Sequence, residues 1–101
     1  MIIYNVTTNV APEIAASWLQ WMKDEHIPEV LHTGLFTHHQ ILHLLDISEA
    51  DGITYAVQYF ATDIHHYHRY VNECAPALRL KTTEKWGDKI ISFRSLMEVV
   101  E

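Results

Sequence analysis

His26 is the residue best suited, by type and position, to carry out chemistry. An apolar stripe at helical spacing precedes it, formed by Ile14, Trp18, Trp21 and Met22. Because His26 lies four residues after Met22, its ring is expected to face the same apolar side as the tryptophans. An imidazole with a reference pKa of about 6.5 can serve as a general acid or base at neutral pH. We therefore predict His26 as the catalytic candidate.

Pro28 provides a structural alternative for His26. Proline has no N–H and clashes with the carbonyl four residues earlier, so the helix is expected to break or kink just after His26. Such a break frees carbonyl groups, and the ring nitrogens of His26 could simply satisfy them. A short second helical segment, Pro28 to His32, would then end at Gly34.

Aromatic side chains from several segments could line a pocket for a planar ligand. The predicted ligand contacts are Tyr4, Trp18, Trp21, Met22, Tyr59 and Trp86, and Tyr55 belongs to the same aromatic set. Large aromatic residues are also common in hydrophobic cores. The sequence is compatible with both interpretations.

Arg94 lies in the middle of an alternating segment, with Ser92 on the same face. A buried guanidinium can bind a carboxylate ligand. It needs a partner whatever the function, however, so the structural alternative is pairing across a dimer face with an acid, or with Gln58 and Asn5.

Eight histidines raise the question of a metal site. His39 and His43 share one side of a predicted strand, and His65 and His68 share a helix face. Zinc usually needs three or four convergent ligands, and Cys74 is poorly placed to complete either pair. We predict no metal and no cofactor. The sequence also lacks a Gly-rich phosphate loop, a G-x-S-x-G elbow, a paired-cysteine motif and an H-E-x-x-H motif.

Composition argues against several kinds of partner. Seven basic and thirteen acidic residues give a net charge of −6, which disfavours nucleic acid. No stretch approaches the roughly 20 apolar residues that cross a bilayer, and the first residues do not resemble a secretory signal. A single cysteine, Cys74, cannot form an internal disulfide. It is expected to be a packing residue in a protein of the reducing cytoplasm.

Alternating and helical patterns place these residues on a short series of elements. Strands are predicted at Ile2–Val10, Leu35–Ile47, Ile53–Ala61 and Asp88–Val100, with a turn at Glu49–Gly52; helices are predicted after Pro12, from Asp63 to about Glu73 with Thr62 as cap, and from Ala75 to Trp86 with Gly87 as terminator. The order predicts one α+β domain, residues 1–101, with the ferredoxin-like βαββαβ fold. Its four-stranded antiparallel sheet would carry the helices on one face.

The other face of this sheet is expected to lack helices. Its predicted members are Ile3, Asn5, Thr7, Thr54, Ala56, Gln58, Phe60, Ile90, Ser92, Arg94 and Leu96. Because an exposed apolar patch of that size is unusual in a monomer, we predict a symmetric homodimer joined face to face.

Six short segments carry a resemblance to known proteins. They are Met1–Thr7, Trp18–Met22, His26–Leu31, Thr33–Thr37, Tyr55–Phe60 and Ala75–Leu78. Taken as a whole, the chain resembles the dimeric α/β barrel superfamily, in which two such sheets close on each other. More closely it is similar to a small bacterial family, a domain of unknown function. The resemblance implies the dimeric barrel fold but no particular activity.

The superfamily includes cofactor-independent monooxygenases, small-ring isomerases, haem-degrading enzymes and ligand-binding modules. The haem-degrading branch shares with this chain only an asparagine on the first strand, Asn5. We expect a protein that binds a small aromatic or carbonyl-containing molecule between helices and sheet. If it is an enzyme, the implied chemistry is cofactor-free proton abstraction or oxygenation with His26 as acid or base. The alternative is a non-catalytic dimerisation or regulatory module.

Overall fold

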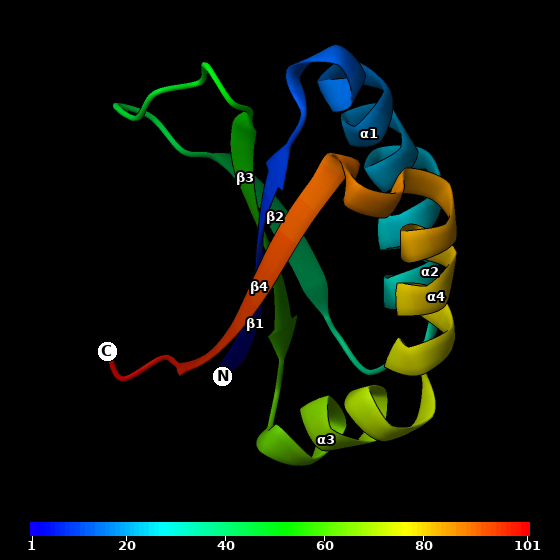
Figure 1. The fold of residues 1–101 in the computed structure, drawn as a ribbon. Coiled ribbons are helices and arrows are strands. Elements are labelled where there is room, and N and C mark those ends of the chain that lie inside the picture. The colour runs from blue at the N-terminus through cyan, green and yellow to red at the C-terminus, as the bar shows by residue number, and fades with distance from the viewer.

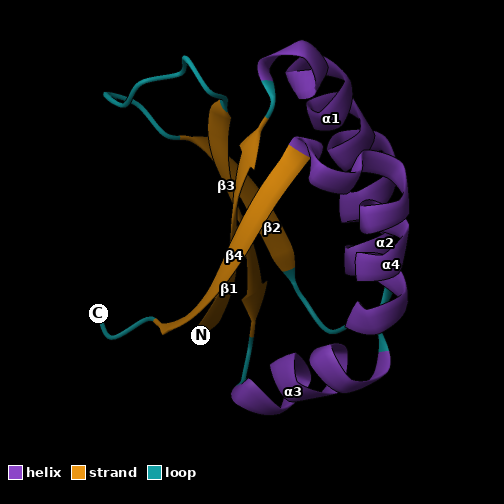
Figure 2. Cartoon of the chain, in the orientation of Figure 1, coloured by secondary structure: helices purple, strands orange, loops and turns teal.

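A four-stranded antiparallel sheet forms one layer of the molecule, and helices cover one of its faces (Figures 1 and 2). The computed structural model describes residues 1–101. The strands are β1 (Ile2–Val10), β2 (His38–His43), β3 (Ile53–Ala61) and β4 (Ile90–Glu98), in the spatial order β2-β3-β1-β4. The helices are α1 (Ala15–Trp21), α2 (Ile27–His32), α3 (Ile64–Glu73) and α4 (Ala75–Trp86). The ferredoxin-like arrangement predicted from the order of the elements is confirmed.

β1 is the strand that ties the sheet together. All nine of its residues pair with β3 on one side and with β4 on the other. Its even-numbered residues face the helices, and four of them are buried: Ile2, Tyr4, Thr8 and Val10. They join Trp18, Val57 and Tyr59 in a core between the two layers. Burial of this apolar face is the main reason that the alternating pattern forms a sheet rather than an isolated hairpin.

The predicted break after His26 is wrong, because the backbone stays helical through Pro28. Residues Met22–His26 form a π-helical turn between α1 and α2. There the Ile27 N–H bonds to the Met22 carbonyl, five residues back. Proline would clash with a carbonyl in a regular α-helix, and the wider turn before it accommodates the ring. The helix then ends near Gly34, which has φ +79°.

Two element boundaries also differ from those expected. β2 is much shorter than Leu35–Ile47, because Leu35 and Phe36 turn inward and are buried in the core before the strand begins. The cap of α3 is Asp63 rather than Thr62, since its Oδ1 accepts a 3.1 Å hydrogen bond from the His66 N–H. The predicted terminator of α4 is confirmed: Gly87 is its C-cap, with φ 56°.

The prediction of which β4 residues face the helices is wrong, because the two faces of the strand are exchanged. Its partners across β1 place Arg94 opposite Val6 and Phe93 opposite Thr7. Arg94 therefore faces the helices, together with Ile90, Ser92 and Leu96, while the helix-free face of β4 carries Ile91, Phe93, Ser95 and Met97. Both sets mix polar and apolar residues, so alternation alone does not reveal which set is inward. The faces predicted for β1 and β3 are confirmed by their register.

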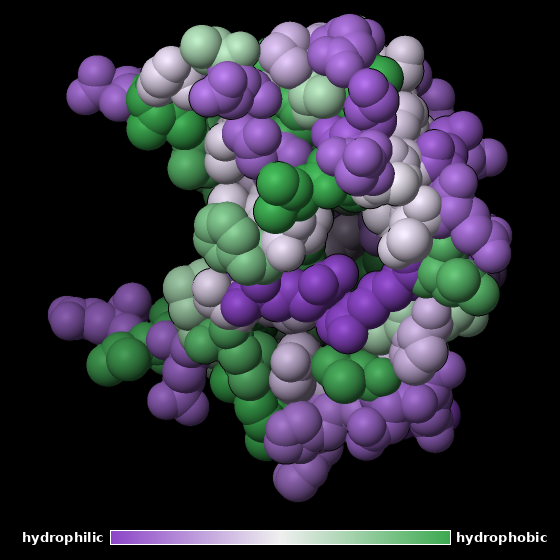
Figure 3. Space-filling view, viewed as in Figure 1, coloured by the Kyte–Doolittle hydropathy of each residue, from purple (hydrophilic) through white to green (hydrophobic).

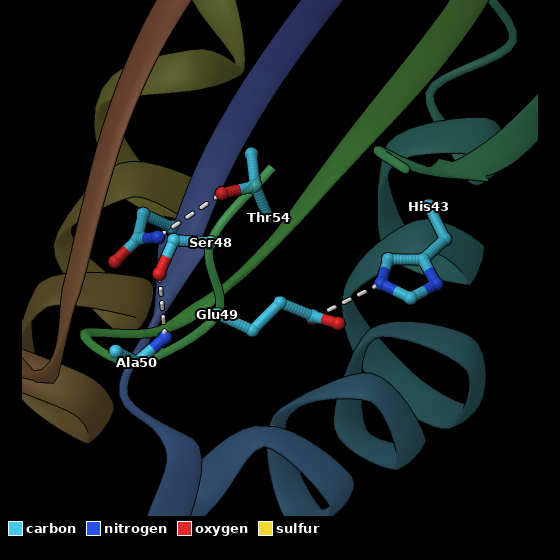
Figure 4. A network of polar contacts seen from close by, with 6 residues as sticks. His43, Ser48, Glu49, Ala50 and Thr54 are labelled. Atoms are coloured by element: carbon cyan, nitrogen blue, oxygen red, sulfur yellow. Dashed lines mark hydrogen bonds and ion pairs between the residues drawn. The ribbon is translucent and has the colours of Figure 1, made fainter. Parts of the chain in front are cut away.

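The connection between β2 and β3 projects beyond the helix-free face, as does the C-terminal end (Figure 1). This connection is held at its base by an ion pair between His43 Nε2 and Glu49 Oε2 at 3.2 Å (Figure 4). Within it, the Ala50 N–H donates to the Ser48 hydroxyl at 3.3 Å. The two projections flank the open side of the sheet.

Candidate ligand-binding site

Two arginines meet at one tyrosine hydroxyl between α4 and the sheet. Arg94 on β4 donates from Nε to the Tyr4 hydroxyl at 3.0 Å, and Arg79 on α4 donates to it from Nη2 at 3.2 Å. The Tyr4 ring below lies among other aromatic rings and is only 3% exposed. A hydroxyl that accepts two hydrogen bonds still has its own hydrogen to donate. The three side chains therefore present mainly hydrogen-bond donors.

Neither guanidinium has a carboxylate partner. The chain's ion pairs of Lys and Arg with acids engage Arg69, Lys81 and Lys89. Arg79 and Arg94 form no salt bridge, although the chain holds thirteen acidic residues. Arg79 is half-buried, whereas Arg94 lies exposed on an edge strand. The arrangement contradicts the predicted pairing of Arg94 across the dimer face, because its side chain lies on the opposite side of the sheet.

A polar hollow of about 190 Å³ adjoins this pair. Figure 3 shows a recess between the sheet layer and the helix layer on the side of β4 and α4, with hydrophilic residues at its edge. Its lining comes from the α4 region and from β4: Arg79, Thr82, Thr83, Gly87, Ile90, Ser92 and Arg94. Drug-sized ligands usually occupy about 300–1,000 Å³, so this hollow suits a small molecule or one end of a larger one.

Arg79, Thr82 and Ser92 are not among the site residues predicted from the sequence. A signal for two of them was present. In α4 the buried positions Ala75 and Leu78 start a stripe at helical spacing that continues through Arg79, Thr82 and Trp86. These positions of a helix normally carry apolar residues that face the core. Polar residues there indicate a polar site in the interior.

Four buried side-chain donors have no hydrogen-bond acceptor in the chain. Arg79 Nε and Trp86 Nε1 are both buried and form no hydrogen bond within the chain, and the same holds for Trp18 Nε1 and the Tyr59 hydroxyl. Leaving a buried donor unpaired typically costs about 1–3 kcal/mol. Two of these donors belong to α4, which also lines the hollow.

The His26 ring stacks on Trp21 and not on the buried Trp18. Its ring lies 5.1 Å from the ring of Trp21 at an interplanar angle of 25°. Trp21 in turn meets Trp86 edge to face at 5.8 Å. Residues five apart are stacked here because the π-helical turn brings them onto one side, which a regular α-helix would not do. His26 thus lies where α1 and α4 approach each other.

Burial disfavours the charged form of His26. Burial lowers its pKa below the usual 6.5; Glu29 acts in the opposite direction, and the positive charges of Lys81 and Arg94 lower it further. Neither ring nitrogen of His26 forms a hydrogen bond within the chain, so the alternative that the ring satisfies carbonyls freed by Pro28 is wrong. A neutral imidazole with a free nitrogen can accept a proton.

The other predicted ligand contacts occupy the interior. Trp18, Met22 and Tyr59 are buried in the core, like Tyr4, and Trp18 stacks on Tyr55 at 5.6 Å. Burial raises the pKa of Tyr59 far above its usual value, so its hydroxyl stays protonated. Trp21 and Trp86 are half-buried and border shallow surface recesses. The largest recess, about 610 Å³, lies elsewhere, on the outer side of α2.

The histidines are dispersed. His43 pairs with Glu49, His66 pairs with Asp63, and the His38 ring stacks on Phe60 at 4.3 Å. Nowhere does the chain bring three His, Cys, Asp or Glu side chains together as possible metal ligands. No helix has the length and apolar character that crossing a membrane requires.

Residues 1–100 match the model of the family described as a domain of unknown function (DUF4286). The chain belongs to this family. No curated protein sequence matches it. The resemblance to a domain-of-unknown-function family, inferred from motifs such as Trp18–Met22 and Thr33–Thr37, is therefore confirmed.

Several solved structures have the same fold as this chain. A mutant of SnoaB, a cofactor-independent oxygenase from Streptomyces nogalater, matches with a TM-score of 0.70 and 14% identity, over 99% of this chain and 93% of that one. A dimeric ferredoxin-like protein from an uncultured marine organism matches at 0.71 and 13%, over 100% and 96%. A mutant of MhuD with two manganese protoporphyrin IX bound per active site matches at 0.61 and 15%, over 98% and 95%. At such identities the likeness establishes the fold alone.

Proposed function

We propose that the protein is a homodimer that binds a small molecule in the hollow between α4 and β4. The carrying observation is a buried donor without an acceptor at the hollow: Arg79, which lines it, has a buried and unpaired Nε. Natural interiors satisfy nearly all buried polar groups, and a bound molecule would supply the missing acceptor. The hollow opens at the edge of the sheet, so a ligand can enter without unfolding either layer.

The dimer would form through the helix-free face of the sheet. Ile91 and Phe93 on that face are 68% and 62% exposed, and Leu42 and Met97 are exposed beside them. The projecting segments add Leu45 and Val100, which are 76% and 91% exposed. A second copy would bury this apolar area, and the described dimer of similar fold supports that occupant. The hollow lies on the other side of the sheet and stays accessible in such a dimer.

His26 favours a catalytic version of this function. His26 has a pKa lowered by burial and no hydrogen-bond partner in the chain, and Arg94, which lines the hollow, is among the charges that lower that pKa. Cofactor-free proton abstraction from a bound carbonyl compound would use such a base, and Arg94 would stabilise the resulting negative charge. The cofactor-independent oxygenase of similar fold makes oxygenation the related candidate. A non-catalytic binding or regulatory module is the alternative.

The test combines oligomeric state with ligand detection. Native mass spectrometry of untagged protein should give twice the chain mass of 11.8 kDa. Backbone N–H signals of Thr82, Gly87 and Ser92, which line the hollow, are then followed by NMR during addition of small neutral and acidic aromatic compounds. The indole N–H signal of Trp18, a donor in the core, is the control and is assigned with Trp18→Phe. Saturable movement of the hollow signals supports the proposal. A monomer contradicts the dimer, and unresponsive hollow signals contradict the binding site.

His26→Gln separates catalysis from binding. If a bound compound is converted, this variant should still bind it while losing turnover, because only the proton acceptor is removed. Unchanged turnover would exclude His26 from the mechanism. Binding without turnover in the wild-type protein would favour the non-catalytic module.

A further inference from the structure

The strongest charge feature in the interior is a cationic pair in an acidic protein. Arg79 and Arg94 come from different layers, yet both donate to the one hydroxyl of Tyr4. Two like charges held together repel, and the fold normally offsets this with a carboxylate. Here none of the thirteen acidic residues forms a salt bridge with either arginine.

The lining around the pair lacks a carboxylate. Beside the guanidinium groups, the hollow is lined by the hydroxyl-bearing residues Thr82, Thr83 and Ser92, without an acidic side chain. Two of these hydroxyls are already engaged. The Thr82 hydroxyl donates to the Leu78 carbonyl at 3.0 Å, and the hydroxyls of Ser92 and Thr8 form a hydrogen bond of 2.8 Å. What remains unsatisfied is the donor set of the arginines, with Arg79 Nε buried and unpaired.

From this geometry we propose that the ligand carries a small oxyanion, a carboxylate or a phosphate, which binds between Arg79 and Arg94. This inference rests on the proposed function and names the class of its ligand. A planar or tetrahedral oxyanion accepts several hydrogen bonds at once, which fits the fork of a guanidinium. The volume of about 190 Å³ suits the charged group and a small body attached to it.

The opening of the hollow fits this role. Arg94 is solvent-exposed on the edge strand, while Arg79 is half-buried behind it. An anion approaching from solvent would meet Arg94 first and lose water as it reaches Arg79. Hydrogen bonds to a charged group strengthen in such a partly dry site. Because the whole chain carries a net charge of −6, anions are repelled from most of its surface and are attracted mainly where these two arginines lie.

The experiment titrates three probes: benzoate, its neutral analogue benzamide, and inorganic phosphate. Binding is followed by NMR through the backbone signals of β4 and the Nε–H signals of Arg79 and Arg94. We expect saturable binding of benzoate or phosphate at this pair, and at least tenfold weaker binding of benzamide than of the oxyanion that binds. Benzoate binding identifies a carboxylate ligand, and binding of phosphate alone identifies a phosphate ligand.

Variants localise the effect. Arg94→Gln should weaken oxyanion binding at least tenfold, and Arg94→Lys should restore part of it by returning the charge. Arg69→Gln is the matched control, because Arg69 is an exposed arginine on α3 paired with Glu73. Because Arg94 is exposed, Arg94→Gln is expected to fold, and it tests the inference without any substitution of the half-buried Arg79.

Two results overturn the inference. Equal affinity for benzamide and benzoate, with Arg94→Gln unchanged, would leave small-molecule binding intact and refute the oxyanion. Failure of all three probes to shift Arg79 and Arg94 would refute the oxyanion site. The NMR test of the proposed function then shows independently whether neutral ligands bind.

Discussion

The Nε of Arg94 lies 3.0 Å from the hydroxyl of Tyr4, and this bond joins an edge strand to the aromatic centre of the core. The Tyr4 ring contacts those of Phe36, Tyr59, Tyr67 and Tyr70. A charged donor at the mouth of the hollow is thereby connected to the most aromatic part of the protein. Changes at either residue are expected to affect both stability and binding.

Tyr4→Phe should lower the free energy of unfolding by about 1–3 kcal/mol, because two guanidinium donors lose their shared acceptor. Urea denaturation followed by circular dichroism measures the change. Tyr59→Phe is the matched comparison: its buried hydroxyl has no partner in the chain, so removing it should leave stability equal or higher. Equal destabilisation by both substitutions would contradict the role assigned to the Tyr4 hydroxyl.

Phe93→Glu should convert the proposed homodimer into a monomer. It introduces a charge at a 62% exposed position on the helix-free face, where a second copy would bury it. Light scattering coupled to size-exclusion chromatography measures the mass. Leu80→Glu provides the control, since Leu80 is 58% exposed but lies on α4. Dissociation by Leu80→Glu instead would place the interface on the helix layer.

Stability should depend on pH through His26. Its folded pKa lies below 6.5, so as the pH falls through the unfolded pKa the unfolded chain takes up a proton first. Unfolding becomes easier, and this contribution to stability is present above pH 6.5 and lost below it.

Urea titrations at pH 7.5, 6.5 and 5.5 measure this dependence. The unfolding free energy of the wild type should fall more steeply toward pH 5.5 than that of His26→Gln. His65→Gln is the control for loss of one titratable group, because His65 is an exposed histidine on α3. If the unfolding free energy of His26→Gln fell with pH as steeply as that of the wild type, the pKa of His26 would be the same in the folded and unfolded chains.

Trp86→Phe should leave stability unchanged or raised in the free protein, because it removes a buried N–H without a partner and keeps an aromatic ring against Trp21. Calorimetry of the free protein and of the protein with its best ligand compares the two states. Ligand stabilisation should be similar in the variant and the wild type, because Trp86 borders a separate recess and does not line the hollow. Marked destabilisation of the free variant would imply that ring packing, rather than the free donor, explains the presence of tryptophan.

Local patterns were sufficient for the fold. Alternation predicts β1 and β3 with the observed ends, and the Pro76 and Gly87 positions delimit α4, because these signals depend on neighbouring residues and backbone angles. His26 could be named as a candidate for the same reason, because helical spacing indicates which residues share a side, whereas Trp86 was named for its aromatic type.

The site itself depended on contacts between distant parts of the chain. Whether Arg94 faces helices or open sheet is decided by its register against β1, since a shift of one residue exchanges the faces and both faces of β4 are mixed. The His26 stack on Trp21 depends on a π-helical turn, whose extra residue is absent from the 3.6-residue pattern. Arg79 and Arg94 are 15 residues apart on different layers, and only tertiary packing brings both to the hydroxyl of Tyr4. The sequence determined the elements, because local forces form them, whereas the donor-rich hollow arises from how the layers pack.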